Sequence, residues 1–314
     1  MPDDMQWLDE ITKGMAQNAH SPQWLAELEL EFAPRSKATV LSRCRHQGPL
    51  SVQRAFYPEQ DGCAHVYLLH PPAGIVSGDE LRIQARLAPG SRALLTTPGA
   101  NRFYRARSTA DNNSAHEQAA NLQQIQRCWF EVEAGAALEY LPLETLVYQQ
   151  ANAVNQVDIR VQGDGCYLGW EVLCLGLPHI QQPFTQGRLL QSNTLFHNEK
   201  PLFHDRMILQ GSDSLQQQKI ALGKQHVVGS FIIFSGKLCD QPAALASLIS
   251  SLRECLATHQ QQNNMAVTEL QGVVVIRHLG DSSEYCRDVF SRLWCIARQH
   301  VLGKKGSSPR IWYT

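Results

Sequence analysis

The sequence predicts a mainly β protein, with many short strands in stacked, sandwich-like layers and a small C-terminal α/β part that contains two helices. Up to about residue 235, short runs of alternating apolar and polar residues are separated by Gly, Pro or Asn, which is typical of all-β folds. Apolar residues recur at helical spacing in 242–260, and a second amphipathic pattern covers 281–303. These patterns favour β layers, with the helices confined to the end of the chain.

The domain organisation is expected to be simple. A chain of 314 residues can form one large β domain or two ordinary domains. Residues 1–22 are polar and aperiodic, and we expect them to form a flexible arm. We expect residues 23–314 to form a single domain, with a β body at 23–240 and a helix-containing part at 241–314.

The first strands are expected to pair as hairpins. Trp24–Phe32 alternates apolar and polar residues, and Lys37–Arg43 is its expected partner. Alternation over 80–87 leads into Pro89-Gly90, and the apolar run 92–97 follows directly. A Pro-Gly pair between two such runs predicts a turn. We therefore predict a β-hairpin across Pro89-Gly90.

The last quarter of the chain predicts helix, strand and helix. Pro242 suits the first turn of the helix at 242–260. Residues 271–280 are a short apolar run that predicts a strand. In the second helix, Asp281 and Glu284 have the spacing of a capping box, and Gly303 is a typical helix stop.

The bulk composition excludes several classes of protein. The 28 Lys and Arg residues nearly balance the 29 Asp and Glu residues, so we expect no nucleic-acid partner. No run is long enough for a membrane-spanning helix, and the N-terminus is acidic, unlike a secretory signal. We therefore expect a cytoplasmic protein with no membrane partner. The nine cysteines are dispersed, which favours reduced thiols.

Enzyme motifs are largely missing from the sequence. It contains no phosphate-binding loop, no GxSxG elbow and no HExxH helix. His70 and Asp79 are candidates for an acid–base pair, and this pair leaves a hydrolase open as an alternative. Asp in a Gly-rich turn more often caps its own backbone, and we favour that role for Asp79.

Metal-binding patterns are also weak. The twelve histidines include no HxH, and we find no Cys–His cluster with ligand spacing. His197 and His204 flank a short segment whose expected hairpin tip is Glu199-Lys200. That hairpin would make the two histidines diagonal neighbours on one face. Together with His70 they are weaker candidates for binding a passing metal ion, and ordinary surface histidines are the favoured interpretation of the pair.

Two carboxylates lie in segments that are otherwise apolar. Glu144 lies in LPLETLVY and Glu171 in GWEVLCLG. A buried carboxylate needs a hydrogen bond or an ion pair, and Arg102 and Arg105 are candidate partners. The alternative is functional: Asp79, Glu144 and Glu171 would line a watery path through which a divalent cation passes. Oxygen ligands would hold such an ion weakly enough for release.

An aromatic and basic cluster follows the turn at Pro98-Gly99. Residues such as Arg102, Phe103, Tyr104 and Arg105 are enriched in protein interfaces. We predict that this turn presents them to a partner, although a solvated turn is an equal alternative.

Several blocks of the sequence resemble one known family. HPPAGIVSGD (70–79) and ALLTTPGANRFYR (93–105) are similar to blocks of the UreD (UreH) family of urease accessory proteins, and further similar blocks extend to PRIW (309–312). The chain departs from the usual family pattern at Ala73-Gly74, Ser77-Gly78 and Leu177-Pro178. The similar blocks nevertheless follow the family order over nearly the whole chain.

The resemblance implies a function. It implies a non-enzymatic factor that helps to insert nickel into the urease active site. The expected partners are UreF, UreG through UreF, and the urease apoprotein. In this family an internal tunnel is proposed to carry nickel, so we expect nickel to bind transiently and no cofactor to bind tightly. A stand-alone nickel store remains an alternative, to which the scarcity of ligand-rich segments is opposed.

Overall fold

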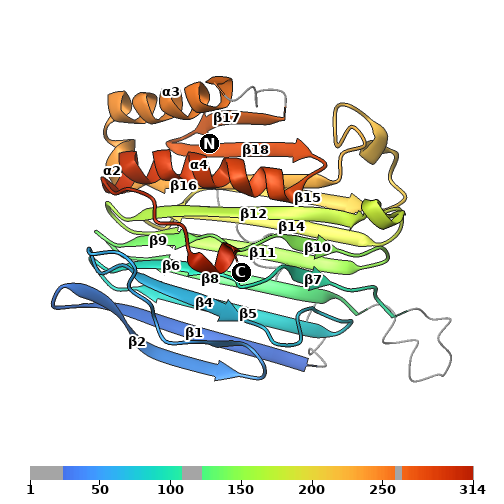
Figure 1. The fold of residues 1–314 in the computed structure, drawn as a ribbon, viewed down its shortest axis with the longest axis horizontal. Coiled ribbons are helices and arrows are strands. Elements are labelled where there is room, and N and C mark those ends of the chain that lie inside the picture. Colours follow the sequence, from blue (N-terminus) through green and yellow to red (C-terminus); the bar gives the residue numbers. More distant parts are fainter. Residues whose placement is uncertain (1–23, 108–121, 259–263, 314) are drawn as a thin grey trace, which may run out of the picture.

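Two β-sheets lie face to face, and two long helices cover the outer face of one of them (Figure 1). This computed structural model describes residues 24–107, 122–258 and 264–313. The mainly β prediction is confirmed. The predicted arm at 1–22 lies outside the described residues.

The first sheet has seven strands. In spatial order they are β15 (Lys200–Gln210), β14 (Arg188–His197), β11 (Asn152–Val161), β8 (Gln124–Val132), β5 (Asp79–Leu87), β1 (Trp24–Arg35) and β2 (Ala38–Gln47). The antiparallel pairs β1–β2 and β14–β15 form its two edges, and the strands between them are parallel. The predicted hairpin of the first two strands is confirmed.

The second sheet has eleven strands. Its main path is β17 (Met265–Leu270), β18 (Val273–Gly280), β16 (Val227–Ser235), β12 (Cys166–Leu177), β9 (Ala137–Tyr140), β6 (Arg92–Thr96), β4 (Ala64–Leu69) and β3 (Ser51–Val52). Three short strands lie off this path: β10 (Thr145–Val147) and β13 (Gln182–Pro183) pair with β12, and β7 (Asn101–Phe103) pairs with β10. Because β16, β17 and β18 belong to this sheet, the C-terminal part continues the β body.

The chain passes back and forth between the two sheets. Between β4 and β9 it crosses twice to the first sheet, as β5 and as β8, and returns each time to the second sheet, which holds β4, β6, β7 and β9. Strands of successive turns pair in parallel, as β4 does with β6, β5 with β8, and β6 with β9. The predicted hairpin across Pro89-Gly90 is therefore wrong, because β5 and β6 belong to different sheets. Both strands bury one face in the same core, and alternation alone does not distinguish this crossing from a hairpin.

The helical elements follow the C-terminal prediction closely. They are α2 (Gly236–Cys239), α3 (Pro242–Thr258) and α4 (Ser283–Leu302), with short 3₁₀ turns η2 (Pro178–Ile180), η3 (Ser214–Gln217) and η4 (Arg310–Tyr313). Both long helices are confirmed, and Gly303 ends α4 at a φ of 65°. The predicted cap is off by one residue, since Ser282 rather than Asp281 caps α4 by accepting a hydrogen bond from Tyr285 N. Among the described residues, the helices are too short or too polar to span a membrane.

The protein has two apolar layers. One lies between the two sheets and includes Phe32, Phe130 and Tyr167. The other lies between the second sheet and its helices, and it includes Trp170 and Phe290. Alternate residues of β12 point into the two layers, so the inner and outer faces of this strand have different surroundings.

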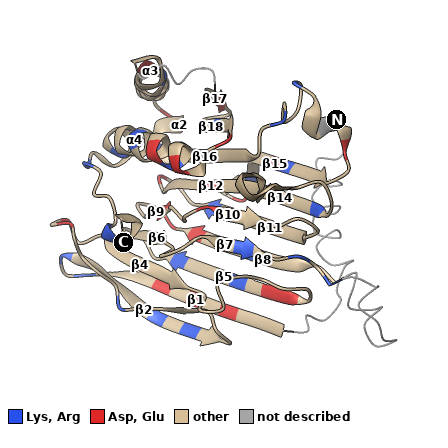
Figure 2. Ribbon diagram, turned by 45° about the vertical axis from the view of Figure 1, so that its right-hand side comes forward, with Lys and Arg blue, Asp and Glu red and all other residues tan. Residues whose placement is uncertain are grey.

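The outer face of the first sheet carries charges of both signs. Arg82 bridges Glu27 and Glu80, and Arg127 also contacts Glu80. Figure 2 shows positive and negative residues interspersed over these strands. This arrangement agrees with the balanced composition, because it concentrates no single sign of charge on this face.

Candidate functional site

A row of hydrogen-bonded polar side chains crosses the core between the two sheets. Asn155 of β11 lies directly beside Gln126 of β8 and Gln191 of β14 in the parallel ladders. All three side chains point inward. Asn101 of β7 and Glu171 of β12 meet them from the second sheet. We call these five residues the polar row.

The row is continuous from one end to the other. Asn101 Nδ2 donates to Gln126 Oε1 at 2.9 Å, and Gln126 Nε2 donates to Asn155 Oδ1 at 3.1 Å. Asn155 Nδ2 then donates to Glu171 Oε2 at 2.6 Å and to Gln191 Oε1 at 2.8 Å. Gln191 Nε2 closes the network by donating to the same Glu171 oxygen at 2.6 Å.

Such a row is costly to bury. Amides in an apolar core destabilise a fold by a few kcal/mol each unless they are hydrogen-bonded, and an apolar core of the same shape avoids that cost altogether. Here the partners satisfy one another, while Asn155 is fully buried. A connected buried network of this kind is therefore a candidate functional site.

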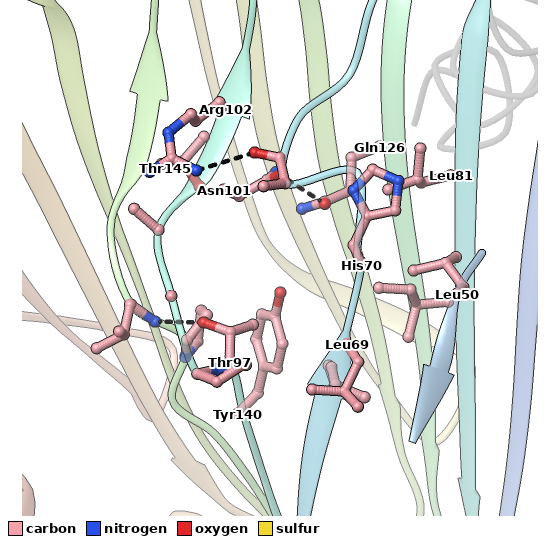
Figure 3. Close-up of a pocket in the computed structure, with 18 residues that line it drawn as sticks. Leu50, Leu69, His70, Leu81, Thr97, Asn101, Arg102, Gln126, Tyr140 and Thr145 are labelled. Carbon is pink, nitrogen blue, oxygen red and sulfur yellow. Dashed lines mark hydrogen bonds between the residues drawn. The ribbon is translucent and has the colours of Figure 1, made fainter. Parts of the chain in front are cut away.

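A cavity of about 250 Å³ lies at the Asn101 end of the row. Figure 3 shows that its walls are mostly apolar, with Leu50 and Tyr140 among them, and that the polar groups of Asn101, Gln126 and His70 also line it. Both ring nitrogens of His70 are buried and lack a hydrogen-bond partner. Burial lowers the pKa of His70, so the neutral imidazole is favoured there.

A much smaller pocket lies at the other end of the row. Glu171 and Gln191 line it together with Asp205, Ser230 and Arg277. Arg277 Nη1 lies 2.8 Å from Asp205 Oδ2, and both side chains are partly exposed. The row thus joins an inner cavity to a small pocket beside a solvent-accessible ion pair.

Glu171 is the only ionisable group of the row. Burial raises its pKa to about 7, while the hydrogen bonds from Gln191 and Asn155 act in the opposite direction. The carboxyl therefore changes charge near neutral pH, and a cation beside it would favour the ionised form.

Glu144 does not belong to this row. It lies on the opposite face of the second sheet, where Arg287 Nε of α4 is 2.8 Å from its Oε2. The two atoms are close enough for an ion pair but are not aligned as a hydrogen bond. An arginine partner was predicted, but Arg102 and Arg105 were the wrong candidates because α4 supplies the cation.

Among the described residues, Asp79 also makes no hydrogen bond to the polar row. Its Oδ2 accepts a hydrogen bond from Val76 N at 3.1 Å, which is the turn-capping role that we favoured. Burial raises its pKa, against the effect of that hydrogen bond and of Arg107. Asp79 does not line the cavity that contains His70, and the His70 nitrogens have no partner. The two residues therefore do not form an acid–base pair.

The two hairpin histidines are held apart. The turn lies at Asn198-Glu199, one residue earlier than predicted, and a bulge between Leu195 and Phe196 shifts the register. As a result His204 lies opposite Thr194 and contacts its hydroxyl, so it is not a diagonal neighbour of His197. His197 Nε2 instead contacts the carbonyl of Gly163 at 2.8 Å.

The predicted partner-binding cluster is only partly at the surface. Phe103 is fully buried in the core, which corrects the expectation that the turn presents it outward. Arg102 donates to the carbonyl of Ala73, and the ring of Tyr104 packs against Gly74, where a Cβ would lie 2.2 Å from it. Only Arg105 is exposed.

The sequence patterns did not lead us to predict one group of potential metal ligands. Glu59, Cys63 and His65 place one ligand atom each within 4.8 Å of one another. The expectation that no Cys–His cluster with ligand spacing exists is therefore wrong. The signal was Cys-x-His, since residues i and i+2 of a strand share a face. The amides of the polar row offered no comparable signal, because register alone brings them together.

Comparisons of the sequence with known proteins identify the family of the chain. The profile of the UreD urease accessory protein family matches residues 25–313. A urease accessory protein UreD from Psychromonas ingrahamii is 41% identical over 310 residues, covering 97% of this chain and 98% of its own length. The chain belongs to the UreD family of urease accessory proteins. A UreD from Dechloromonas aromatica is 35% identical, covering 96% of this chain and 98% of its own length.

Ala73, a departure from the usual UreD pattern, has an unusual backbone conformation. Ala73 takes the place of a glycine, and it adopts a φ of 60°. Glycine reaches this region without steric cost, whereas alanine is strained there. Two hydrogen bonds hold the loop in this conformation: the carbonyl of Ala73 accepts from Arg102, and its N–H donates to His70 O.

Proposed function

We propose that this UreD-family protein supports nickel insertion into urease as a scaffold and an ion conduit. It would stand between a UreF–UreG complex and the urease apoprotein, and it would carry out no catalysis itself. The observation that carries the proposal is the polar row, which crosses an otherwise apolar core and joins two pockets.

The chemistry of the row suits transfer better than storage. Its potential ligands are amide oxygens and one carboxylate, which bind nickel more weakly than thiolate or imidazole does. Glu171 can take up or release a proton near neutral pH as a cation leaves or arrives. Passage requires the amides to exchange their mutual hydrogen bonds for the ion and its water.

The contacts of His70 and Asp79, together with the names of the relatives, support the proposal that the protein is not an enzyme. His70 and Asp79 do not interact, and the relatives are named as accessory proteins. A protein that passes an ion along needs no nucleophile and no bound cofactor.

The test is Glu171→Gln, which preserves shape and hydrogen bonding but removes the charge. In cells that express urease with its accessory proteins, we expect urease activity and nickel content to fall at least about tenfold, as is typical when groups that tune a metal are lost. The matched control is Glu131→Gln, which breaks an exposed pair with Arg86 and should leave both unchanged.

Co-purification separates the two parts of the proposal. UreF and urease subunits should be recovered equally with the wild type and with Glu171→Gln, because Glu171 is buried. Full nickel loading of urease in cells with Glu171→Gln would contradict the conduit role but leave the scaffold role standing. Full nickel loading in a strain that lacks the protein would sink both.

A further inference from the structure

Beneath helix α4, a second polar cluster lies on the opposite face of the second sheet from the polar row. Cys63 directly precedes β4, His65 is the second residue of that strand, and Cys63 packs in the outer apolar layer. The preceding loop folds back, so that Glu59 Oε1 lies 2.7 Å from His65 Nε2. The three residues supply one sulfur, one nitrogen and one oxygen ligand within 4.8 Å of one another.

The loop that brings these ligands together is firmly held. Asp61 Oδ1 accepts from Cys63 N, and its other oxygen pairs with Arg92 at 2.7 Å. Gly62 adopts a φ of 74°, and a Cβ there would lie 2.4 Å from the carbonyl of Lys37. A site whose ligands are fixed in advance loses little conformational entropy when it binds an ion.

The state of His65 is an independent pointer to a ligand. Its side chain is only 1% exposed, yet Nδ1 has no hydrogen-bond partner. Because Nε2 faces a carboxylate, that nitrogen carries the hydrogen and Nδ1 keeps a free lone pair. For one ion to be ligated by both His65 and Glu59, Nε2 gives up this hydrogen bond to bind the metal, and the ring hydrogen moves to Nδ1.

We propose that Glu59, Cys63 and His65 form a binding site for one divalent transition-metal ion, either Ni²⁺ or Zn²⁺. Thiolate and imidazole ligands select such ions over Mg²⁺ or Ca²⁺. Binding releases the thiol proton of Cys63 to solvent, and the thiolate ligates the metal. Three protein ligands leave a position for water, which makes the ion exchangeable.

Arg298 sets a limit on the affinity of this site. Its Nη2 lies 2.8 Å from Glu59 Oε1, and its Nε pairs with Glu139. An incoming cation shares Glu59 with this guanidinium and is repelled by it. The site therefore favours reversible binding of one ion. It does not depend on the conduit proposed above, since no residue of the polar row takes part.

Absorption spectroscopy of the purified full-length protein tests the site. Titration with Ni²⁺ should produce a thiolate-to-nickel charge-transfer band that saturates at one equivalent. Cys63→Ser should abolish the band, and Cys44→Ser, which removes an exposed thiol, should preserve it. Zn²⁺ should displace nickel and bleach the band if both ions bind; failure to displace assigns the site to Ni²⁺ alone.

A second variant and a wild-type measurement cover a folding failure of Cys63→Ser. His65→Ala should weaken Ni²⁺ binding at least about tenfold in a chelator competition, whereas the matched control His204→Ala should not. X-ray absorption of the wild type with one equivalent of Ni²⁺ should show a sulfur ligand. No sulfur ligand in the wild type, or an unchanged band in Cys63→Ser, overturns the proposal.

Discussion

Carboxylates on the two faces of the second sheet have different partners. On the outer face, Glu139 contacts Arg298 and Glu144 contacts Arg287, and both arginines belong to α4. On the inner face, Glu171 is hydrogen-bonded only to the neutral amides of Asn155 and Gln191. In the part of the chain that the structure describes, the outer carboxylates therefore pair with arginines, whereas Glu171 pairs with amides.

This difference separates a structural role from a functional one. An arginine neutralises the outer carboxylates and ties α4 to the sheet, so these groups have a cation already. Burial raises the pKa of Glu139, and Arg298 and Trp294 oppose that rise. Among the described residues, no cation pairs with Glu171: Arg277 lines the same pocket but pairs with Asp205. The pKa of Glu171 is about 7, and its carboxyl can respond to an arriving ion. Three substitutions test this distinction.

The largest effect is expected from Arg298→Met. The change leaves Glu139 buried without its cation, and Glu59 also loses a partner. We expect the free energy of unfolding to fall by about 3–5 kcal/mol, as for other broken buried pairs, in denaturant titrations. The control on the same helix is Arg292→Met, whose exposed pair with Asp288 should contribute less than about 1 kcal/mol. Equal losses in the two variants would contradict a special role for the buried pair.

A pH dependence is expected from Glu171. Its folded pKa of about 7 lies above the ordinary 4.5, so between these values the folded state retains a proton that the unfolded state has lost. Stability should therefore decrease as pH rises through this window, by about 3 kcal/mol in total. Unfolding titrations at several pH values should show a larger decrease in the wild type than in Glu171→Gln, because the carboxyls of Glu139 and Asp79, whose pKa values burial also raises, titrate in both proteins. Parallel pH profiles of the two proteins would contradict the raised pKa.

The smallest effect is expected from Glu144→Gln. Both members of the Glu144–Arg287 pair retain some contact with solvent, and partly exposed pairs contribute about 1 kcal/mol or less. The free energy of unfolding should change by that amount, and urease activation should remain at the wild-type level. A loss of activation as large as that expected for Glu171→Gln would place Glu144 on the ion path and remove the contrast between the two faces.

Local patterns were enough to predict many elements. Helical spacing located α3 and α4, and alternation located β1, β2 and β5. Alternation did not reveal which sheet a strand joins, so the turn at Pro89-Gly90 was predicted as a hairpin although it is a crossing. Glu171 was recognised because a carboxylate in an apolar strand is a local anomaly. Gln126, Asn155 and Gln191 are not anomalous in sequence, and only strand register aligns them.

The sequence by itself determined the class of fold, the positions of most strands and helices, and the family, because each of these depends on neighbouring residues or on ordered blocks. Only the tertiary structure decided which polar groups meet. It set Glu171 against amides and Glu144 against Arg287 because alternate residues of a strand point to opposite faces, and it brought Glu59 back to His65 through a loop. Contacts of this kind depend on strand register and on loops that fold back, and the spacing of residues along the sequence predicts neither.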